Sequence, residues 1–119
     1  MNRNFAGIIK QIDVFCDDRD WRQFHNPKDL AEAVVIEAGE LLEQFLWKTK
    51  KQSEDHMKNV EGRAEVESEV ADIFIYLFEF CRLNDVDVEA VVTKKLLEAG
   101  KKYPVEKAKG SIKKYTKLK

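Results

Sequence analysis

Residues 61 to 83 read EGRAEVESEVADIFIYLFEFCRL, and this stretch decides the fold. Its apolar residues recur with helical spacing; they are Val66, Val70, Ile73, Phe74, Leu77, Phe78, Phe80 and Cys81. A half-buried strand would instead alternate apolar and polar residues, and no such alternation is present. The stretch therefore predicts a long amphipathic helix that buries one face against other helices.

Three further segments show the same helical period, and they cover residues 4–17, 28–47 and 88–99. Asn26 followed by Pro27 is typical of a helix start, and Gly100 is typical of a helix end. Residues 48–59 are polar and lack apolar periodicity, so we expect a loop there. Since no segment favours a strand, the sequence predicts an all-α four-helix bundle.

The length of 119 residues is typical of a single domain, which we expect to span residues 1–119. From about residue 101 the chain is basic, and we expect a largely irregular tail. Cys16 and Cys81 lie far apart within apolar helical stretches, which favours buried thiols over a disulfide.

The overall charge limits the partners of the chain. The formal net charge of -1 gives no bulk attraction to nucleic acid or to an anionic membrane surface. No run approaches the about 18 apolar residues of a membrane span, and residues 1–5 lack the apolar core of a signal peptide. We therefore expect a cytoplasmic protein without a membrane or nucleic-acid partner.

Two pairs of acidic residues mark the edges of the apolar stripes. Glu37 and Glu40 are three residues apart in one predicted helix, and so are Glu69 and Asp72 in another. This spacing places both acids of a pair on one side of a helix. Packed together, the four carboxylates would repel one another unless a cation lay between them, and Mg²⁺ prefers such oxygen ligands. The spacing alone is also compatible with ordinary solvated helix charges, which are common.

Several short motifs, taken in order and spacing, resemble those of the MazG-like nucleotide pyrophosphohydrolases, closest to the subgroup that contains the dCTP pyrophosphatase. They are RDWRQFHNPKDL (19–30), EAGEL (37–41), FLWK (45–48), EVADIFIYL (69–77), KKL (94–96), KYPV (102–105) and KYT (114–116). The resemblance implies an all-α bundle of the NTP pyrophosphohydrolase type, assembled as a homodimer or homotetramer. It also implies Mg²⁺-dependent hydrolysis of a (deoxy)nucleoside triphosphate, such as dCTP or a modified dNTP, to the monophosphate and pyrophosphate.

The resemblance also assigns roles to individual residues. The Mg²⁺ ligands it implies are Glu37, Glu40, Glu69 and Asp72. The substrate-binding residues it implies are Trp21, His25, Trp47, Tyr76, Lys95 and Tyr103. Ala99 departs from the family, which usually has Asn there, and this puts base or sugar selectivity in doubt.

Among the acids, Glu40 is the first candidate for the general base that takes a proton from the attacking water, because it lies between Glu37 and Glu43 on one helix flank. The sequence does not separate it from Glu37 or Glu69.

Other interpretations remain open at this point. A related bundle hydrolase could act on dUTP or on a phosphoribosyl-nucleotide, and a non-catalytic helical interaction module would leave the acids as surface charge. Trp21 and Trp47 are compatible with core packing as well as with base stacking, and His25 with a capping or surface role. His56 is expected to be a surface residue. Ile75, Phe74 and Phe78 spread apolar character around the helix at 61–83, which independently favours a second subunit.

Overall fold

The computed structural model describes residues 5–119, and every regular element within them is a helix. The elements are α1 (Ala6–Asp18), η1 (Arg22–Phe24), α2 (Pro27–Glu43), α3 (Lys50–Lys58), α4 (Val60–Leu83), α5 (Val88–Lys102), α6 (Val105–Ala108) and η2 (Tyr115–Lys117). The prediction of an all-α chain is confirmed. No helix among the described residues is long and apolar enough to cross a membrane.

The starts of the two long helices agree closely with the sequence. α4 extends the stretch at 61–83 by a single residue, Val60. α2 begins at Pro27, where the Asn26 side chain accepts a hydrogen bond from the Asp29 backbone N–H at 2.9 Å. The predicted start of the first helix, at residue 4, lies outside the described residues.

The end of α2 differs from the prediction of residue 47. The helix stops at Glu43, and turns follow up to Trp47, whose φ of 62° lies in the left-handed region. A bulky residue rarely adopts this conformation, and it ends the helical path.

Two further predictions were wrong. Residues 48–59 are not a loop, because α3 forms there from a capping box. In it Thr49 Oγ1 accepts from the Gln52 N–H at 3.1 Å, and Gln52 Oε1 accepts from the Thr49 N–H at 2.9 Å. Gly100 does not stop α5, which continues to Lys102. The helix ends two residues before Pro104, and Tyr103, the residue directly before the proline, is no longer helical, in agreement with the bias of pre-proline residues against helix.

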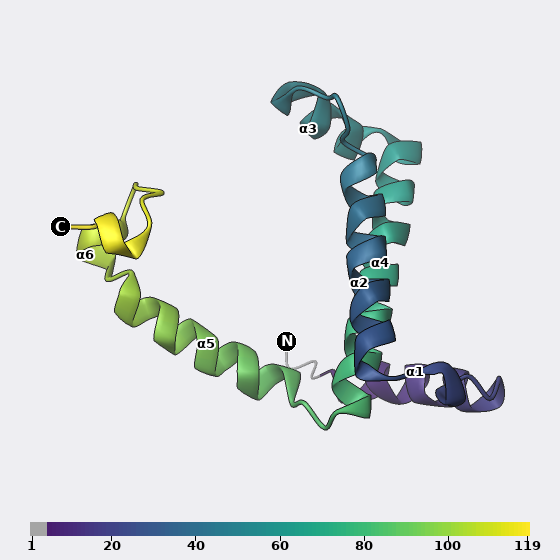
Figure 1. Cartoon of the computed structure of the whole chain (residues 1–119). Coiled ribbons are helices and arrows are strands. Elements are labelled where there is room, and N and C mark those ends of the chain that lie inside the picture. The colour runs from purple at the N-terminus through teal and green to yellow at the C-terminus, as the bar shows by residue number, and fades with distance from the viewer. Residues whose placement is uncertain (1–4) are drawn as a thin grey trace. The chain divides into compact units, whose positions relative to one another are not determined.

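The first compact unit, which ends at Val86, is organised around α2 and α4 (Figure 1). These two helices run antiparallel, side by side, and share the most extensive contact between elements. α1 and α3 each pack against α4, near its opposite ends. The core is small, and its buried apolar residues are Ile12, Cys16, Leu30, Val66, Phe78 and Cys81. Both cysteines are buried free thiols, as the sequence indicated.

The second unit, Asp87–Lys119, contains α5, α6 and η2. Within it the rings of Tyr103 and Tyr115 meet edge to face at 6.0 Å, and Lys102 Nζ lies 4.9 Å from the centre of the Tyr115 ring. These contacts connect the end of α5 to η2, so the basic tail is more ordered than its composition suggests.

His56 holds α3 in place, although the sequence indicated a bland surface residue. It is half-buried, its Nε2 lies 3.1 Å from Gln44 Oε1, and its ring meets the Phe45 ring edge to face. Gly62 of α4 packs directly beneath it. A Cβ at Gly62 would lie 2.6 Å from the His56 carbonyl oxygen. The close approach of α3 to α4 therefore requires a residue without a side chain.

We predict that Gly62→Ala lowers the free energy of unfolding by about 1–3 kcal/mol, because the backbone of His56 must shift to admit the methyl group. Urea denaturation measures this change. Gly7→Ala in α1 is the matched control, since apart from its own helix nothing lies within 4 Å of its Cβ position, and it should keep or raise the stability by up to about 1 kcal/mol, as alanine does in a helix. Equal stability of the two variants would contradict the assigned role of Gly62.

Candidate active site

The antiparallel pairing of α2 and α4 brings four carboxyl groups together. Glu37 and Glu40 project from α2, and Glu69 and Asp72 project from α4. One oxygen of each side chain lies within 4.8 Å of the corresponding oxygens of the other three. We call this group the four-acid cluster. The structure thus brings together the four residues that we predicted as metal ligands. Their role as ligands remains a prediction.

The four-acid cluster is electrostatically unfavourable when nothing positive is bound. A hydrogen bond with Glu40, followed by burial and by the charges of the other carboxylates, raises the pKa of Glu37 to about 7. Burial, followed by a hydrogen bond with Glu40, raises the pKa of Glu69 as well. Glu40 therefore contributes to the raised pKa of both neighbours. The buried oxygens Glu37 Oε2 and Glu69 Oε2 have no hydrogen-bond partner among the described residues.

These observations fit a hard divalent cation. The donor set consists only of carboxylate oxygens, which Mg²⁺ prefers, whereas a zinc site would normally include His or Cys. A cation would satisfy the two unpaired oxygens and offset the repulsion between the carboxylates, which adds to the hydrogen bonding and burial that raise the two pKa values. The residues present therefore fit Mg²⁺ on chemical grounds.

The other proposed substrate residues lie in different environments. Tyr76 is half-buried one turn after Asp72 on α4. The Trp21 ring meets the Phe15 ring edge to face at 5.5 Å and is partly exposed, while Trp47 is 92 % exposed. Lys95 is exposed, with its Nζ 3.9 Å from a Glu98 carboxylate oxygen. Lys95 and Tyr103 belong to the second unit, so the structure does not place them relative to the four-acid cluster.

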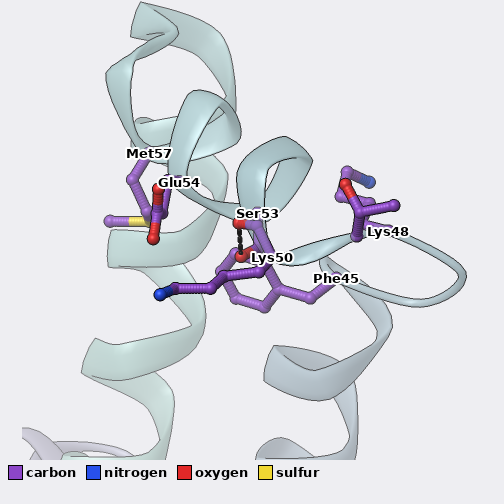
Figure 2. A pocket seen from close by; sticks show the side chains of 7 residues that line it. Phe45, Lys48, Lys50, Ser53, Glu54 and Met57 are labelled. Carbon is purple, nitrogen blue, oxygen red and sulfur yellow. Dashed lines mark hydrogen bonds between the residues drawn. The ribbon is translucent and has the colours of Figure 1, made fainter.

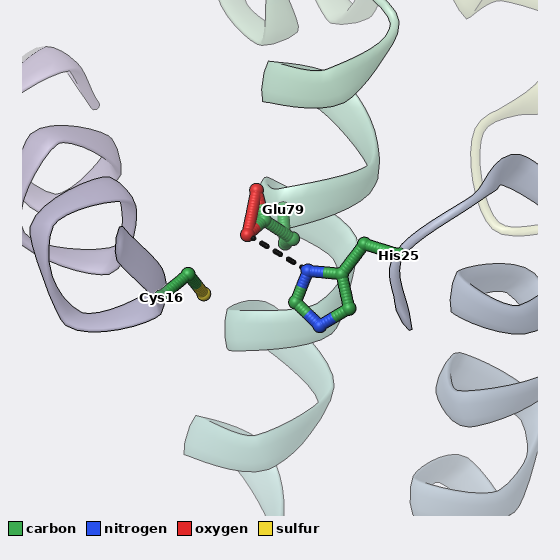
Figure 3. A group of neighbouring side chains, drawn as sticks. All are labelled: Cys16, His25 and Glu79. Atoms are coloured by element: carbon green, nitrogen blue, oxygen red, sulfur yellow. Dashed lines mark hydrogen bonds and ion pairs between the residues drawn. The ribbon is translucent and has the colours of Figure 1, made fainter. Parts of the chain in front are cut away.

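His25 forms a contact that the sequence did not indicate. Its Nδ1 lies 3.2 Å from Glu79 Oε2, and Cys16 is beside them (Figure 3). The Glu79 side chain is only 1 % exposed, and it also pairs with Arg82, three residues later on α4. The sequence does contain an indication of this contact. Glu79 and Arg82 interrupt the apolar run at the end of α4, and charges buried in such a run are normally paired.

An open pocket of about 500 Å³ lies where the chain passes from α2 into α3 (Figure 2). Its lining residues are Phe45, Lys48, Thr49, Lys50, Ser53, Glu54 and Met57. Since none of the four carboxylates lines it, the chemistry is assigned to the four-acid cluster and not to this pocket.

The fold and the site define an all-α protein whose central helix pair carries an acidic candidate metal centre. The chain belongs to the MazG-like family, because residues 33–118 match the model of that family.

Individual relatives agree with this assignment. The chain is 38% identical over 104 residues to dCTP pyrophosphatase 1 of Homo sapiens and to that of Rattus norvegicus. Each match covers 87% of this chain and 61% of the relative, so the chain spans less than two thirds of the length of these proteins. It also resembles the crystal structure of a pyrophosphatase from Archaeoglobus fulgidus, with a TM-score of 0.79 and 31% identity, covering 87% of this chain and 95% of the other.

The raised pKa values predict how stability depends on pH in a chelator. Glu37 binds its proton up to about pH 7 in the folded state, but only up to about 4.5 when unfolded. The folded state thus holds more protons across this window, so the free energy of unfolding contributed by Glu37 falls as pH rises from about 4.5 to 7. Mg²⁺ should counter this loss, giving a larger thermal shift at pH 8 than at pH 5.

Differential scanning fluorimetry in EDTA and in Mg²⁺ measures both effects. Glu37→Gln should be less sensitive to pH in EDTA and should respond less to Mg²⁺. An equal Mg²⁺ shift in this variant and in the parent would contradict the assignment of Glu37.

Proposed function

We propose that this chain is a Mg²⁺-dependent nucleoside triphosphate pyrophosphohydrolase. The substrate is a (deoxy)nucleotide such as dCTP or a modified dNTP, and the products are the monophosphate and pyrophosphate. The observation that carries the proposal is the convergence of four carboxylates with two unpaired buried oxygens. The names of the relatives support the reaction class. The corresponding role is the cleaning of the nucleotide pool in the cytoplasm.

The ion would be held by Glu37, Glu40, Glu69 and Asp72. Bound Mg²⁺ supplies positive charge for the phosphate oxygens and lowers the pKa of bound water. Glu40 is the proposed general base for the water that attacks the α-phosphorus. Glu40 lies between Glu37 and Glu43 on one flank of α2, and its carboxylate contributes to the raised pKa of both Glu37 and Glu69, which supports this choice.

The nucleoside would be bound by aromatic residues. Tyr76 follows Asp72 by four residues on α4, so both lie on one side of that helix, and a base could extend from the four-acid cluster along it. Trp21, Trp47 and His25 are the proposed partners of the base, and stacking on an aromatic ring contributes about 1–3 kcal/mol. Lys95 and Tyr103 of the second unit are proposed to contact the polyphosphate. Ala99, in α5, leaves the base preference open to measurement.

We further propose that the chain works as a homodimer or homotetramer. On α2, Val35 and Leu42 are 71 % and 67 % exposed, and the spacing of seven residues places them on one side of the helix. On α5, Leu96 and Leu97 are also largely exposed. Apolar surface of this extent on both units favours burial against a second copy.

We predict that Glu40→Gln and Glu69→Gln each lower kcat by at least about 100-fold while the helical content is retained. Glutamine has nearly the same shape as glutamate but carries no negative charge, so each variant removes a carboxylate without changing the packing. Pyrophosphate release from dCTP, with and without Mg²⁺, measures the rate, and circular dichroism checks the fold. Glu32→Gln is the matched control, since Glu32 is an exposed acid of the same helix that pairs with Lys28. It should keep the parent rate, and full activity of either cluster variant would rule out the assignment.

A panel of the eight common nucleoside triphosphates in the same assay, with a phosphoribosyl-nucleotide added, defines the substrate. We expect one deoxynucleoside triphosphate to be hydrolysed faster than the others, and pyrophosphate to be released only in the presence of Mg²⁺. A chain that releases no pyrophosphate from any of them would instead act as a helical interaction module.

The proposed assembly predicts more than one chain per particle in sedimentation velocity. Val35→Glu should shift the distribution toward monomer, because it places a charge on the apolar side of α2. Lys51→Gln alters the net charge equally on exposed α3 and should leave the distribution unchanged. A parent protein that sediments only as monomer would contradict the proposal.

A further inference from the structure

A second group of potential metal ligands lies apart from the four-acid cluster. It consists of Cys16 from α1, His25 from the segment after η1 and Glu79 from α4, and we call it the Cys-His-Glu cluster (Figure 3). One ligand atom from each side chain lies within 4.8 Å of the other two. Three separate elements therefore contribute a sulfur, a nitrogen and an oxygen donor to one point.

The two oxygens of Glu79 have different partners. Arg82 Nε pairs with Oε1, whereas Oε2 faces His25 Nδ1 at 3.2 Å. The Arg82 contact thus orients the carboxylate and leaves Oε2 available as a ligand. Hydrogen-bonded partners behind a ligand commonly fix its orientation in this way.

The surrounding charges do not oppose a cation. Arg82 would repel one if it were alone, but its Nε also lies 3.4 Å from Asp13 Oδ1, and Arg22 pairs with both Asp13 and Asp17. With Cys16 as thiolate, the side chains carry four negative charges, on Cys16, Glu79, Asp13 and Asp17, and three positive ones, on Lys10, Arg22 and Arg82. The network is therefore net negative before an ion binds.

The donor chemistry selects the metal. Thiolate and imidazole ligands favour Zn²⁺ over Mg²⁺, and Zn²⁺ readily accepts a carboxylate as a third ligand with water in the fourth position. Burial, with a hydrogen bond to Glu79, raises the pKa of the Cys16 thiol to about 12, so the metal-free cluster keeps this proton. Only an ion with a strong preference for sulfur would displace it.

We propose that Cys16 Sγ, His25 Nδ1 and Glu79 Oε2 form a Zn²⁺ site that is distinct from the four-acid cluster. On binding, the S–H bond of Cys16 breaks, an S–Zn bond forms, and the proton passes to solvent. Binding of the ion through His25 Nδ1 requires that the ring carry its proton on Nε2. No electron is transferred.

The consequence is structural. The ion would add a direct link between α1, the segment before α2 and α4 within the first unit, beside the hydrogen bonds and ion pairs that already connect them. It would fix the ring of His25 through Nδ1 and leave its Nε2–H free. The site is independent of whether the chain hydrolyses nucleotides.

Co²⁺ replaces Zn²⁺ with the same ligands and reports a thiolate by a charge-transfer band in the near ultraviolet. We expect titration of the full chain with Co²⁺ to produce this band and to saturate near one equivalent. Zn²⁺ should then abolish the band, because Zn²⁺ has a filled d shell. The Glu37→Gln/Glu69→Gln double variant should retain the band, which separates this site from the four-acid cluster.

Cys16→Ser should abolish the band, whereas Cys81→Ser, which changes the other buried thiol, should retain it. His25→Gln should weaken Co²⁺ binding by at least about tenfold, and it tests the site even if Cys16→Ser fails to fold. A parent protein without the band, or one whose band survives in folded Cys16→Ser, would overturn the proposal. Glu79 would then be only a hydrogen-bonded anion.

Discussion

Repulsion between carboxylates on facing helices is the constraint on which this structure depends. α2 and α4 run antiparallel, so Glu37 and Glu40 meet Glu69 and Asp72. Interaction with Glu40, burial and the neighbouring carboxylates raise the pKa values of Glu37 and Glu69, and one buried oxygen of each has no hydrogen-bond partner among the described residues. α2 and α4 share the most extensive contact between elements, and α1 and α3 also pack against α4. A cation bound between these carboxylates would offset their repulsion and could at the same time bind the phosphate groups of a substrate.

The long helices and the four acids could be predicted from the sequence because both depend on local periodicity. The apolar repeat of residues 61–83 predicted α4, and the three-residue spacing predicted that the two acids of each pair lie on one side of a helix. α3 was missed because it begins with the Thr49–Gln52 capping box, whose signal is hydrogen bonding and not hydrophobicity. Pairing of Glu79 with His25 could not be predicted, since it joins residues 54 positions apart.

α4 thus contributes to two candidate metal sites with different donor atoms. Asp72 belongs to a group of oxygen donors, and Glu79, two turns later, belongs to a group with sulfur and nitrogen donors. Tyr76 lies between them in sequence. The oxygen donors would favour Mg²⁺, whereas the sulfur and nitrogen donors would favour Zn²⁺. The two proposed sites could therefore bind different ions within one small unit.

Direct cation binding tests the central claim. Isothermal titration of the parent chain with Mn²⁺, a substitute for Mg²⁺, should show saturable binding at a site formed by Glu37, Glu40, Glu69 and Asp72. The same titration of Glu37→Gln/Glu69→Gln should show none at that affinity, with an unchanged circular dichroism spectrum. Identical isotherms for the two proteins would contradict the account, because they would mean that Glu37 and Glu69 do not contribute to cation binding.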